Sequence, residues 1–241
     1  MIYINAAIGA GKTSLTELLV KDLGTKGYYE KVDNMPMLTK FYSAGKDSRY
    51  QLAFALQCAF LNLRYQQLRE GLYLAEEKGQ RNLVYDSSLL SDGLMAKNLF
   101  KRGEFPKEEY NLYLELAQNM QANVSGHPFS GFPNLVVYLD IPFDLMLQHI
   151  TGRARAMEVT DPSLIDYYKS VWKTYRHWAD SYSQSAMVTI DMSKYDFVND
   201  LADREAVLDL IEHKLIEIGQ LTQADYDKII SNRKQTLVTN N

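Results

Sequence analysis

Apolar residues along the chain form two alternating patterns: short runs rich in β-branched and aromatic residues, and longer stretches with a helical pattern. The short runs predict β-strands at residues 1–5, 28–31, 82–86, 134–140 and 186–191. The longer stretches predict α-helices at about residues 12–23, 48–77, 89–100, 107–123, 143–151, 162–184 and 200–218. Strands separated by helices imply βαβ crossovers, so we expect an α/β fold with a mainly parallel sheet.

No internal repeat and no low-complexity linker interrupts this alternation. Residues 125–132 are rich in Gly, Pro and Ser, but the stretch is short, so we interpret it as a connection within one domain. We therefore expect a single domain at residues 1–220. Residues 221–241 are polar and predict a C-terminal extension, which is either a further helix with a frayed end or a tail.

Composition narrows the classes of function. Of the 241 residues, 46% are hydrophobic and 23% are charged, which is typical of a globular protein that buries a substantial core. The net charge of −4 argues against a nucleic acid polymer or a membrane as partner, because both need a basic field. The single cysteine, Cys58, excludes a disulfide framework and fits a reducing compartment. With no signal peptide and no apolar run of ~18 residues, we expect a soluble cytoplasmic protein.

A glycine-rich loop follows the first predicted strand and opens the first predicted helix, with the sequence Ala6-Ala7-Ile8-Gly9-Ala10-Gly11-Lys12-Thr13. In this context backbone N–H groups at a helix N-terminus cradle phosphate oxygens. The lysine reaches the terminal phosphates and the hydroxyl that follows it binds a magnesium ion. Ala6 replaces the usual first glycine, and alanine adds only one methyl group. The loop predicts a nucleotide-phosphate site and leaves the reaction open; its members are Ile8, Gly9, Ala10, Gly11, Lys12, Thr13 and Ser14.

Polar residues elsewhere predict where an acceptor molecule binds. Glu30 ends the second predicted strand, at the sheet edge where α/β folds place ligands, and a carboxylate there can take the proton of a hydroxyl. A surface glutamate or a helix cap is an equally good interpretation. Gln57 and Arg64 lie seven residues apart on one face of a nearly all-apolar predicted helix. A buried arginine needs an anion, for which Asp92 is the natural candidate; a structural ion pair beside a satisfied amide is the alternative.

Further segments follow the loop in a fixed order: residues 30–42, then Phe54-Ala55-Leu56-Gln57 with Phe60 and Arg64, then Tyr85-Asp86-Ser87-Ser88 with Asp92, then residues 150–158 and 166–168, and finally Asp196-Phe197. With the loop, this order resembles the deoxyribonucleoside kinase family, particularly its bacterial deoxyadenosine/deoxyguanosine branch. The resemblance runs from about Ile2 to Phe197. Several ordered motifs are far more specific than the glycine-rich loop alone.

The resemblance implies a P-loop kinase fold, in which a five-stranded parallel sheet in the order 2-3-1-4-5 is flanked by helices and a short arginine lid lies at about residues 150–160. It implies phosphorylation of the 5′-hydroxyl of a small deoxyribonucleoside, either a purine deoxynucleoside or deoxycytidine, with ATP as the phosphate donor and Mg²⁺. Relatives bury long apolar helices in a homodimer, and residues 48–77 and 89–123 offer such surface, so we also expect a homodimer.

The resemblance also assigns a role to each site residue. Glu30 would be the catalytic base, and the positive groups acting on the phosphates would be Lys12, Arg153 and Arg155. Magnesium would be held by Thr13 with Asp86, and the donor would contact Arg153, Asp196 and Phe197 in addition to the loop. The acceptor would be bound by Glu30, Tyr42, Gln57, Phe60, Arg64, Asp92 and Glu158, with Tyr42 and Glu158 at its 3′-hydroxyl. Solvated surface arginines are the alternative for Arg153 and Arg155, and core packing is the alternative for Phe60.

Three positions depart from the family pattern. Ser87 and His149 stand where the family has arginines, and Lys31 stands where it has a proline. Loss of the charge-assisted contact at position 87 costs roughly 1.5–3 kcal/mol if nothing replaces it. Two interpretations follow: an active kinase, or a catalytically weak nucleoside- or nucleotide-binding paralogue that forms a heterodimer with an active homologue. Lys12, Thr13, Glu30, Asp86, Arg153 and Arg155 favour the active kinase.

Two other classes are disfavoured. A nucleoside monophosphate kinase needs extra positive charge in its acceptor pocket, and the only cation expected there, Arg64, is matched by Asp92. A GTPase is disfavoured because the chain has no Asn-Lys-x-Asp guanine motif.

Overall fold

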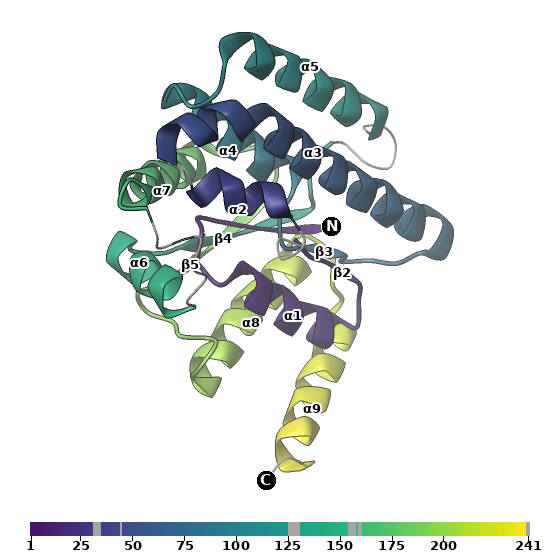
Figure 1. Ribbon diagram of the computed structural model, residues 1–241. Coiled ribbons are helices and arrows are strands. Elements are labelled where there is room, and N and C mark those ends of the chain that lie inside the picture. The colour runs from purple at the N-terminus through teal and green to yellow at the C-terminus, as the bar shows by residue number, and fades with distance from the viewer. Residues whose placement is uncertain (31–34, 44, 125–130, 154–157, 159–160, 240–241) are drawn as a thin grey trace.

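Figure 1 shows the computed structural model, which describes residues 1–30, 35–43, 45–124, 131–153, 158 and 161–239. Five strands form one parallel sheet in the order β2-β3-β1-β4-β5, which confirms the predicted fold class and strand order. The strands are β1 (Ile2–Ala6), β2 (Gly27–Tyr28), β3 (Val84–Tyr85), β4 (Leu135–Asp140) and β5 (Ala186–Asp191). β1 lies at the centre, between β3 and β4.

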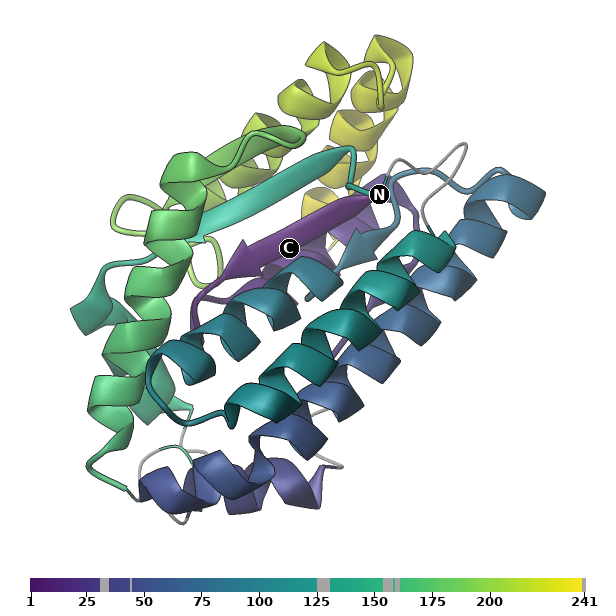
Figure 2. The same ribbon diagram turned by 90° about the horizontal axis from the view of Figure 1, so that it is seen from above.

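Helices lie on both sides of the sheet (Figure 1). On one side are α2 (Pro36–Ser43), α3 (Gly45–Lys78), α4 (Leu89–Lys101), α5 (Lys107–Val124) and α7 (Leu164–Ser181). Seen from above, α3, α4 and α5 run side by side (Figure 2). On the other side are α1 (Lys12–Leu23), α8 (Leu201–Glu217) and α9 (Gln223–Thr239), while α6 (Phe143–Gly152) follows β4.

Two strands are shorter than predicted, and this moves two site residues off them. β2 ends at Tyr28 and β3 ends at Tyr85, so Glu30 and Asp86 follow the strands and are not their last residues. The Asp86 N–H still donates to the Tyr28 carbonyl oxygen at 2.9 Å, so the hydrogen bonding between β2 and β3 extends one residue past the end of β3. Both carboxylates therefore remain at the carboxyl edge, where a parallel sheet binds ligands.

Two helices differ from the prediction at the start of the acceptor region. α2 was not predicted at all, because eight residues are too few to show a helical period. It begins at Pro36, a residue suited to the first position of a helix because its fixed φ matches and its missing N–H is not needed there. α3 begins at Gly45, earlier than the predicted residue 48, and is 34 residues long.

The two faces of β1 pack into two different clusters. Ile2 and Ile4 belong to the main core, which extends between the sheet and the surrounding helices. Tyr3 faces a smaller cluster, in which the Tyr28 and Tyr85 rings stack with their centroids 4.6 Å apart. Every residue of β1 is buried, as expected for a central strand of a parallel sheet that is covered on both faces.

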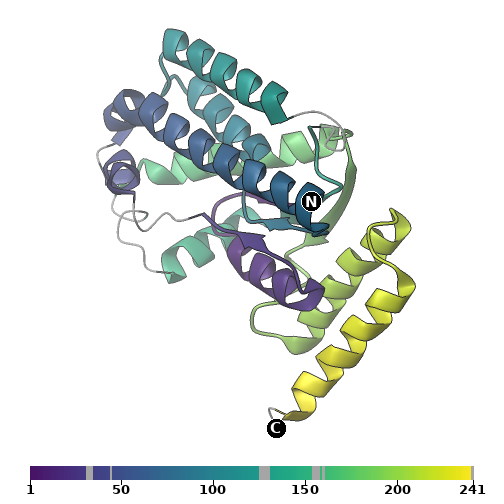
Figure 3. The same ribbon diagram turned by 90° about the vertical axis from the view of Figure 1, so that its right-hand side faces the viewer.

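The C-terminal segment is helical. α9 packs against α1, and Figure 3 shows it running past α8. Its Arg233 donates to Glu212 at 2.7 Å, to Asp22 at 2.7 Å and to Asp209 at 3.1 Å. These ion pairs attach α9 to α8 and α1, although the division of the chain at residue 220 stays a prediction. Throughout the described part of the chain, no helix is long and apolar enough to span a membrane.

Candidate active site

The glycine-rich loop connects β1 to α1, as predicted. Gly9 and Gly11 have φ angles of 79° and 88°, in the left-handed region that favours glycine. A Cβ atom on Gly9 would lie 2.9 Å from the Ile150 side chain, and one on Gly11 would lie 3.2 Å from the Phe197 ring. Gly11 is the N-cap of α1, so no side chain at the N-cap accepts a hydrogen bond from the first N–H groups of the helix. The loop therefore offers the backbone N–H groups of a helix N-terminus, packed closely between α6 and Phe197.

Lys12 and Thr13 follow the loop and meet the end of β3. The Thr13 hydroxyl donates to Asp86 Oδ2 at 2.7 Å, so the two predicted magnesium residues lie side by side. Lys12 Nζ contacts the carbonyl oxygens of Ala6 and Ala7 at 3.5 Å, which is long for a hydrogen bond. Burial lowers the pKa of Lys12, whereas the carboxylates of Asp86 and Glu30 oppose that shift.

One cavity of about 1050 Å³ joins this loop to the acceptor region. The loop residues from Ile8 to Ser14 line one part of it, and Glu30, Asp92 and Glu158 line another. Of the predicted site residues within the described part of the chain, only Arg64 is not on the wall itself, and it contacts two residues that are. The fold thus brings together residues from α1, α2, α3, α4 and the ends of three strands.

Arg64 lies between two carboxylates at the floor of the acceptor region. It donates to Glu30 Oε1 at 2.6 Å, and its Nε is 3.7 Å from Asp92 Oδ1. The expected Arg64–Asp92 pair is therefore the longer contact, and the closer partner is Glu30. Ser87 also lines the cavity and, being uncharged, offers Glu30 no second cation. Gln67, on the same helix as Arg64, donates to the Tyr29 carbonyl oxygen at 2.8 Å. This hydrogen bond ties α3 to the residue that precedes Glu30.

Several polar atoms around Arg64 are buried and have no hydrogen-bond partner within the described residues: Gln57 Oε1, Asp92 Oδ2 and Arg64 Nε. Burial raises the pKa of Asp92 to about 7; Arg64 opposes this shift, and the negative charge of Glu30 adds to it. Buried polar groups are normally paired, and leaving them unpaired is unfavourable. This arrangement is suited to a ligand that carries hydrogen-bond donors and acceptors along one edge.

Aromatic side chains and one carboxylate form the wall next to α7. Tyr42 is buried and packs edge-on against the Tyr167 ring, with centroids 6.2 Å apart. Burial raises the pKa of Tyr42 well above its ordinary value, so its hydroxyl stays protonated. Glu158 accepts two hydrogen bonds from Arg153, both 2.7 Å long, and Tyr168 donates to the Glu158 backbone carbonyl at 2.8 Å. Phe60 is buried and also lines the cavity.

The remaining predicted residues lie around the loop or outside the described residues. Phe197 is fully buried against Gly11, and Asp196 accepts hydrogen bonds from the Asn199 side chain at 3.0 and 3.1 Å. His149 Nδ1 lies 3.0 Å from the Gly9 carbonyl oxygen, which assigns its proton to Nδ1 and ties α6 to the loop. Arg155 and Lys31 lie outside the described residues, so their roles stay predictions.

Sequence reasoning missed part of the wall. Ser91 and Tyr175 line the cavity, and the Ser91 hydroxyl donates to Asn5 Oδ1 at 2.7 Å. Tyr175 lies eight residues beyond Tyr167 on α7, a spacing that places both on the same helix face. That periodicity was readable in the sequence, whereas the Ser91–Asn5 contact, 86 residues apart, depends on the fold.

The glycine-rich loop between β1 and α1, the Thr13–Asp86 pair and the strand order together define a P-loop kinase. Within that class the family is specific. A family model described as "Deoxynucleoside kinase" matches residues 2–217, so the chain belongs to the deoxynucleoside kinase family. The protein is accordingly an enzyme that phosphorylates deoxynucleosides.

The alignments with curated relatives cover nearly the whole chain. A deoxyguanosine kinase of Lactobacillus acidophilus is 39% identical over 230 residues, which are 95% of this chain and 96% of that protein. A deoxyadenosine kinase of the same organism is 36% identical over 223 residues, or 92% of this chain and 99% of that protein. Among solved structures, deoxyadenosine kinase from M. mycoides with bound dCTP has a TM-score of 0.68 at 20% identity, and covers 88% of this chain and 98% of that one. This last likeness supports the fold.

Proposed function

We propose that the protein transfers the terminal phosphoryl group of ATP, in the presence of Mg²⁺, to the 5′-hydroxyl of a purine deoxynucleoside or deoxycytidine. The observation that carries this proposal is the single cavity of about 1050 Å³, which the phosphate loop shares with Glu30 and with the buried polar set around Arg64. A phosphate donor and a polar planar acceptor can therefore meet within one cavity. The relatives named above are kinases, so the comparisons do not support the alternative of a weakly catalytic binding subunit.

The residues present fit magnesium and a nucleoside triphosphate. Thr13 Oγ1 and Asp86 Oδ2 are 2.7 Å apart and supply the hydroxyl and carboxylate oxygens that magnesium prefers. The loop supplies N–H groups from a backbone that packs so closely against Ile150 and Phe197 that a Cβ atom at Gly9 or Gly11 would crowd them. When bound, Mg²⁺ and ATP supply the phosphoryl group and neutralise part of its charge.

The chain's own residues supply the positioning and the proton acceptor. Glu30 accepts the proton of the attacking hydroxyl, since its carboxylate lies at the carboxyl edge of the sheet and lines the same cavity as the loop. Arg64 orients that carboxylate through their 2.6 Å contact. Lys12 and Arg153 stabilise the negative charge of the phosphates, because both are cations on the cavity wall.

The acceptor preference follows from the groups on the acceptor wall. The Gln57 amide offers both a donor and an acceptor, and Asp92 beside Arg64 offers a second such pair. Purine and cytosine edges carry adjacent donors and acceptors that can satisfy these groups. Relatives named as deoxyguanosine, deoxyadenosine and deoxyadenosine/deoxycytidine kinases support the same range. The aromatic wall of Tyr42 and Tyr167, next to Glu158, faces the sugar and suits an unblocked 3′-hydroxyl.

The test is ADP production from ATP and Mg²⁺ with deoxyadenosine, deoxyguanosine, deoxycytidine and thymidine, each assayed separately. We expect turnover with at least one purine deoxynucleoside or deoxycytidine, and a loss of about a thousandfold or more in kcat for Glu30→Gln with ATP binding retained. Wild-type protein that binds ATP but turns over none of the four nucleosides would overturn the proposal.

A further inference from the structure

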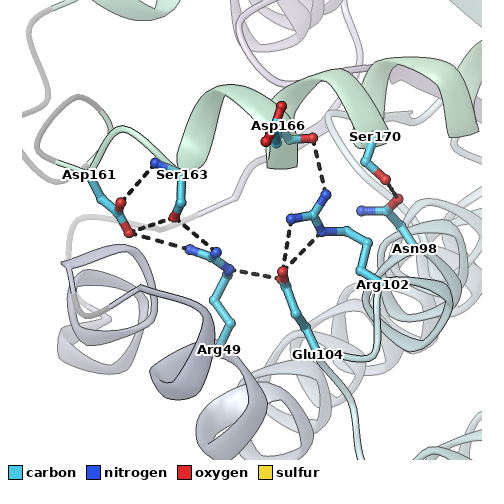
Figure 4. Close-up of polar contacts among 8 residues, drawn as sticks. All are labelled: Arg49, Asn98, Arg102, Glu104, Asp161, Ser163, Asp166 and Ser170. Atoms are coloured by element: carbon cyan, nitrogen blue, oxygen red, sulfur yellow. Dashed lines mark hydrogen bonds and ion pairs between the residues drawn. The ribbon is translucent and has the colours of Figure 1, made fainter.

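A buried group of ion pairs lies outside the cavity and joins three parts of the fold (Figure 4). Arg49 comes from the first turns of α3, Glu104 from the connection between α4 and α5, and Asp161 and Ser163 from the start of α7. Arg49 and Glu104 are each 1% exposed. The proposed reaction uses none of these residues, although Asp161 is only three positions beyond Glu158 of the cavity wall.

Glu104 holds two arginines together. Arg49 Nε donates to its Oε2 at 2.8 Å, and Arg102 donates to its Oε1 from Nη2 at 2.8 Å and from Nε at 3.2 Å. All three contacts are charge-assisted, and Arg102 approaches with two nitrogens on one oxygen. Because the carboxylate is buried, it fixes both guanidinium groups in place relative to the end of α4.

Both arginines then contact α7 from the same side. Arg49 Nη2 donates to the Ser163 hydroxyl at 3.2 Å, and Arg49 Nη1 lies 3.7 Å from Asp161 Oδ2. Ser163 in turn donates to Asp161 through its backbone N–H at 2.9 Å and its hydroxyl at 2.8 Å. Arg102 Nη1 donates to the Asp166 carbonyl oxygen at 3.1 Å. The first turn of α7 is therefore held at both its side chains and its backbone.

The same turn of α7 reaches the cavity through Tyr167. The guanidinium carbons of Arg49 and Arg102 lie 5.7 and 5.6 Å from the centre of the Tyr167 ring, within range of cation–π attraction. Tyr167 packs against Tyr42, and the neighbouring Tyr168 donates to the Glu158 carbonyl oxygen at 2.8 Å. The contacts run without a gap from Arg49 to the wall that the proposed function assigns to the sugar.

We propose that Arg49 is a positioning residue for the acceptor: it sets the place of Tyr167 and Glu158, and through them the sugar-binding wall. The proposal rests on the proposed function, because it concerns the acceptor half of that site. A buried charged cluster adds little stability over an apolar one of the same volume, so stability alone is a weak reason for it. Its directional contacts instead fix the orientation of α7 against α3, which carries Gln57 and Arg64.

The experiment compares Arg49→Met with Arg233→Met, which breaks a similar set of ion pairs remote from the cavity. Both are assayed with the nucleoside that the wild-type protein phosphorylates fastest, at a temperature where all the variants are folded. For Arg49→Met we expect KM for the nucleoside to rise about tenfold or more while KM for ATP changes less than about twofold. For Arg233→Met we expect a lower melting temperature with kcat and both KM values unchanged. Wild-type turnover in the same assay tests the proposed function separately.

Three further variants cover the case in which Arg49→Met does not fold. Asp161→Ala and Ser163→Ala remove the α7 side of the contact at positions that are at least partly exposed, and we expect each to raise KM for the nucleoside about threefold or more. Arg49→Lys, which keeps the charge but not the forked geometry, should lie between wild type and Arg49→Met. If these variants lower the melting temperature but leave KM for the nucleoside at its wild-type value, the cluster is structural and the proposal is wrong.

Discussion

Arg64 and Arg233 each form ion pairs with more than one carboxylate. They differ in how many hydrogen bonds the guanidinium group donates to those carboxylates. Arg233 makes four hydrogen bonds of 2.7 to 3.1 Å to three carboxylates, and these link α9 to α1 and α8. Arg64 makes one short contact to Glu30 and a longer one, 3.7 Å, to Asp92. Near Arg64, Gln57 Oε1 and Asp92 Oδ2 are buried and have no hydrogen-bond partner in the part of the chain that the structure describes.

The comparison separates an arginine that holds helices together from one that prepares a binding site. Around Arg233 three carboxylates accept four hydrogen bonds from its two terminal nitrogens, and within the described residues only its Nε lacks a partner. Around Arg64 the set is completed only when something else supplies donors and acceptors, and the cavity beside it is large enough for that. Changes at the two positions should therefore affect different quantities.

The largest effect is expected for Arg64→Met. This variant leaves Glu30 without its 2.6 Å partner and Asp92 without a counter-charge, so both the proton acceptor and the acceptor pocket lose their positioning. We expect kcat/KM for the nucleoside to fall about a thousandfold, which corresponds to about 4 kcal/mol. Steady-state kinetics measures it, with the exposed Arg69→Met on the same helix as the control. A loss below tenfold would contradict the positioning role of Arg64.

Arg233→Met should instead reduce stability. It removes the cation shared by Asp22, Asp209 and Glu212 and leaves those carboxylates facing one another. Breaking a largely buried ion pair typically costs about 3 kcal/mol, and we expect that reduction in the free energy of unfolding. Urea unfolding followed by circular dichroism gives the value. A drop in kcat at low temperature, where the variant is fully folded, would mean that α9 reaches the active site.

A smaller effect is expected in the pH dependence of stability. Burial raises the pKa of Glu212 to about 7, against an ordinary value of 4.5. Between these pH values the folded chain binds more protons than the unfolded chain, so this residue makes stability fall as pH rises through that window. Glu212→Gln should remove that contribution, so the variant should gain roughly 2 kcal/mol relative to wild type between pH 5 and pH 8.

Urea unfolding at several pH values measures this difference, with Glu217→Gln as the matched control, because Glu217 is an exposed residue on the same helix. A difference between Glu212→Gln and wild type that stays constant with pH would show that Glu212 titrates normally.

The smallest effect is expected for Ser87→Arg. This variant would give the carboxylates near Arg64 a further cation, so that they are more fully paired, as the carboxylates around Arg233 are. An arginine at position 87 offers Glu30 a second cation and lets Arg64 move toward Asp92. We expect kcat to rise severalfold, or about 1 kcal/mol in activation free energy. Ser87→Lys, which lacks the forked geometry, serves as the comparison. An unchanged or lower kcat would show that Arg64 already performs this role fully.

The fold was largely predictable because its signals are local. The alternation of apolar runs and helical patterns located all five strands, although β2 and β3 contain only two residues each. α2 was not predicted, because a helix of eight residues that begins with a proline shows too little periodicity. The strand order came from the resemblance, since the pairing of β1 with β3 and β4 depends on contacts far apart in the sequence.

Most of the residues that line the cavity were named from the sequence, but their pairings were not, and the role of each site residue stays a prediction. The loop and the Thr13–Asp86 contact follow from motifs with fixed geometry. The partner of Arg64 does not, because two carboxylates from different elements compete for it and only their distances decide. The Arg49–Glu104 contact was missed because the sequence gives no signal that joins two charged residues 55 positions apart. The sugar-binding roles of Tyr42 and Glu158 stay predictions, as do the roles of the other site residues and the homodimer.

The central place of β1 has a consequence for synthesis. β1 leaves the ribosome first, but its neighbours are β3, at residues 84–85, and β4, at residues 135–139. A fully buried apolar strand must therefore wait until residue 139 has been added before both of its edges are hydrogen-bonded. Contacts this distant in sequence form slowly and leave apolar strands exposed to aggregation in the meantime. The strand that carries the phosphate loop therefore lacks its second neighbour until more than half of the chain has been synthesised.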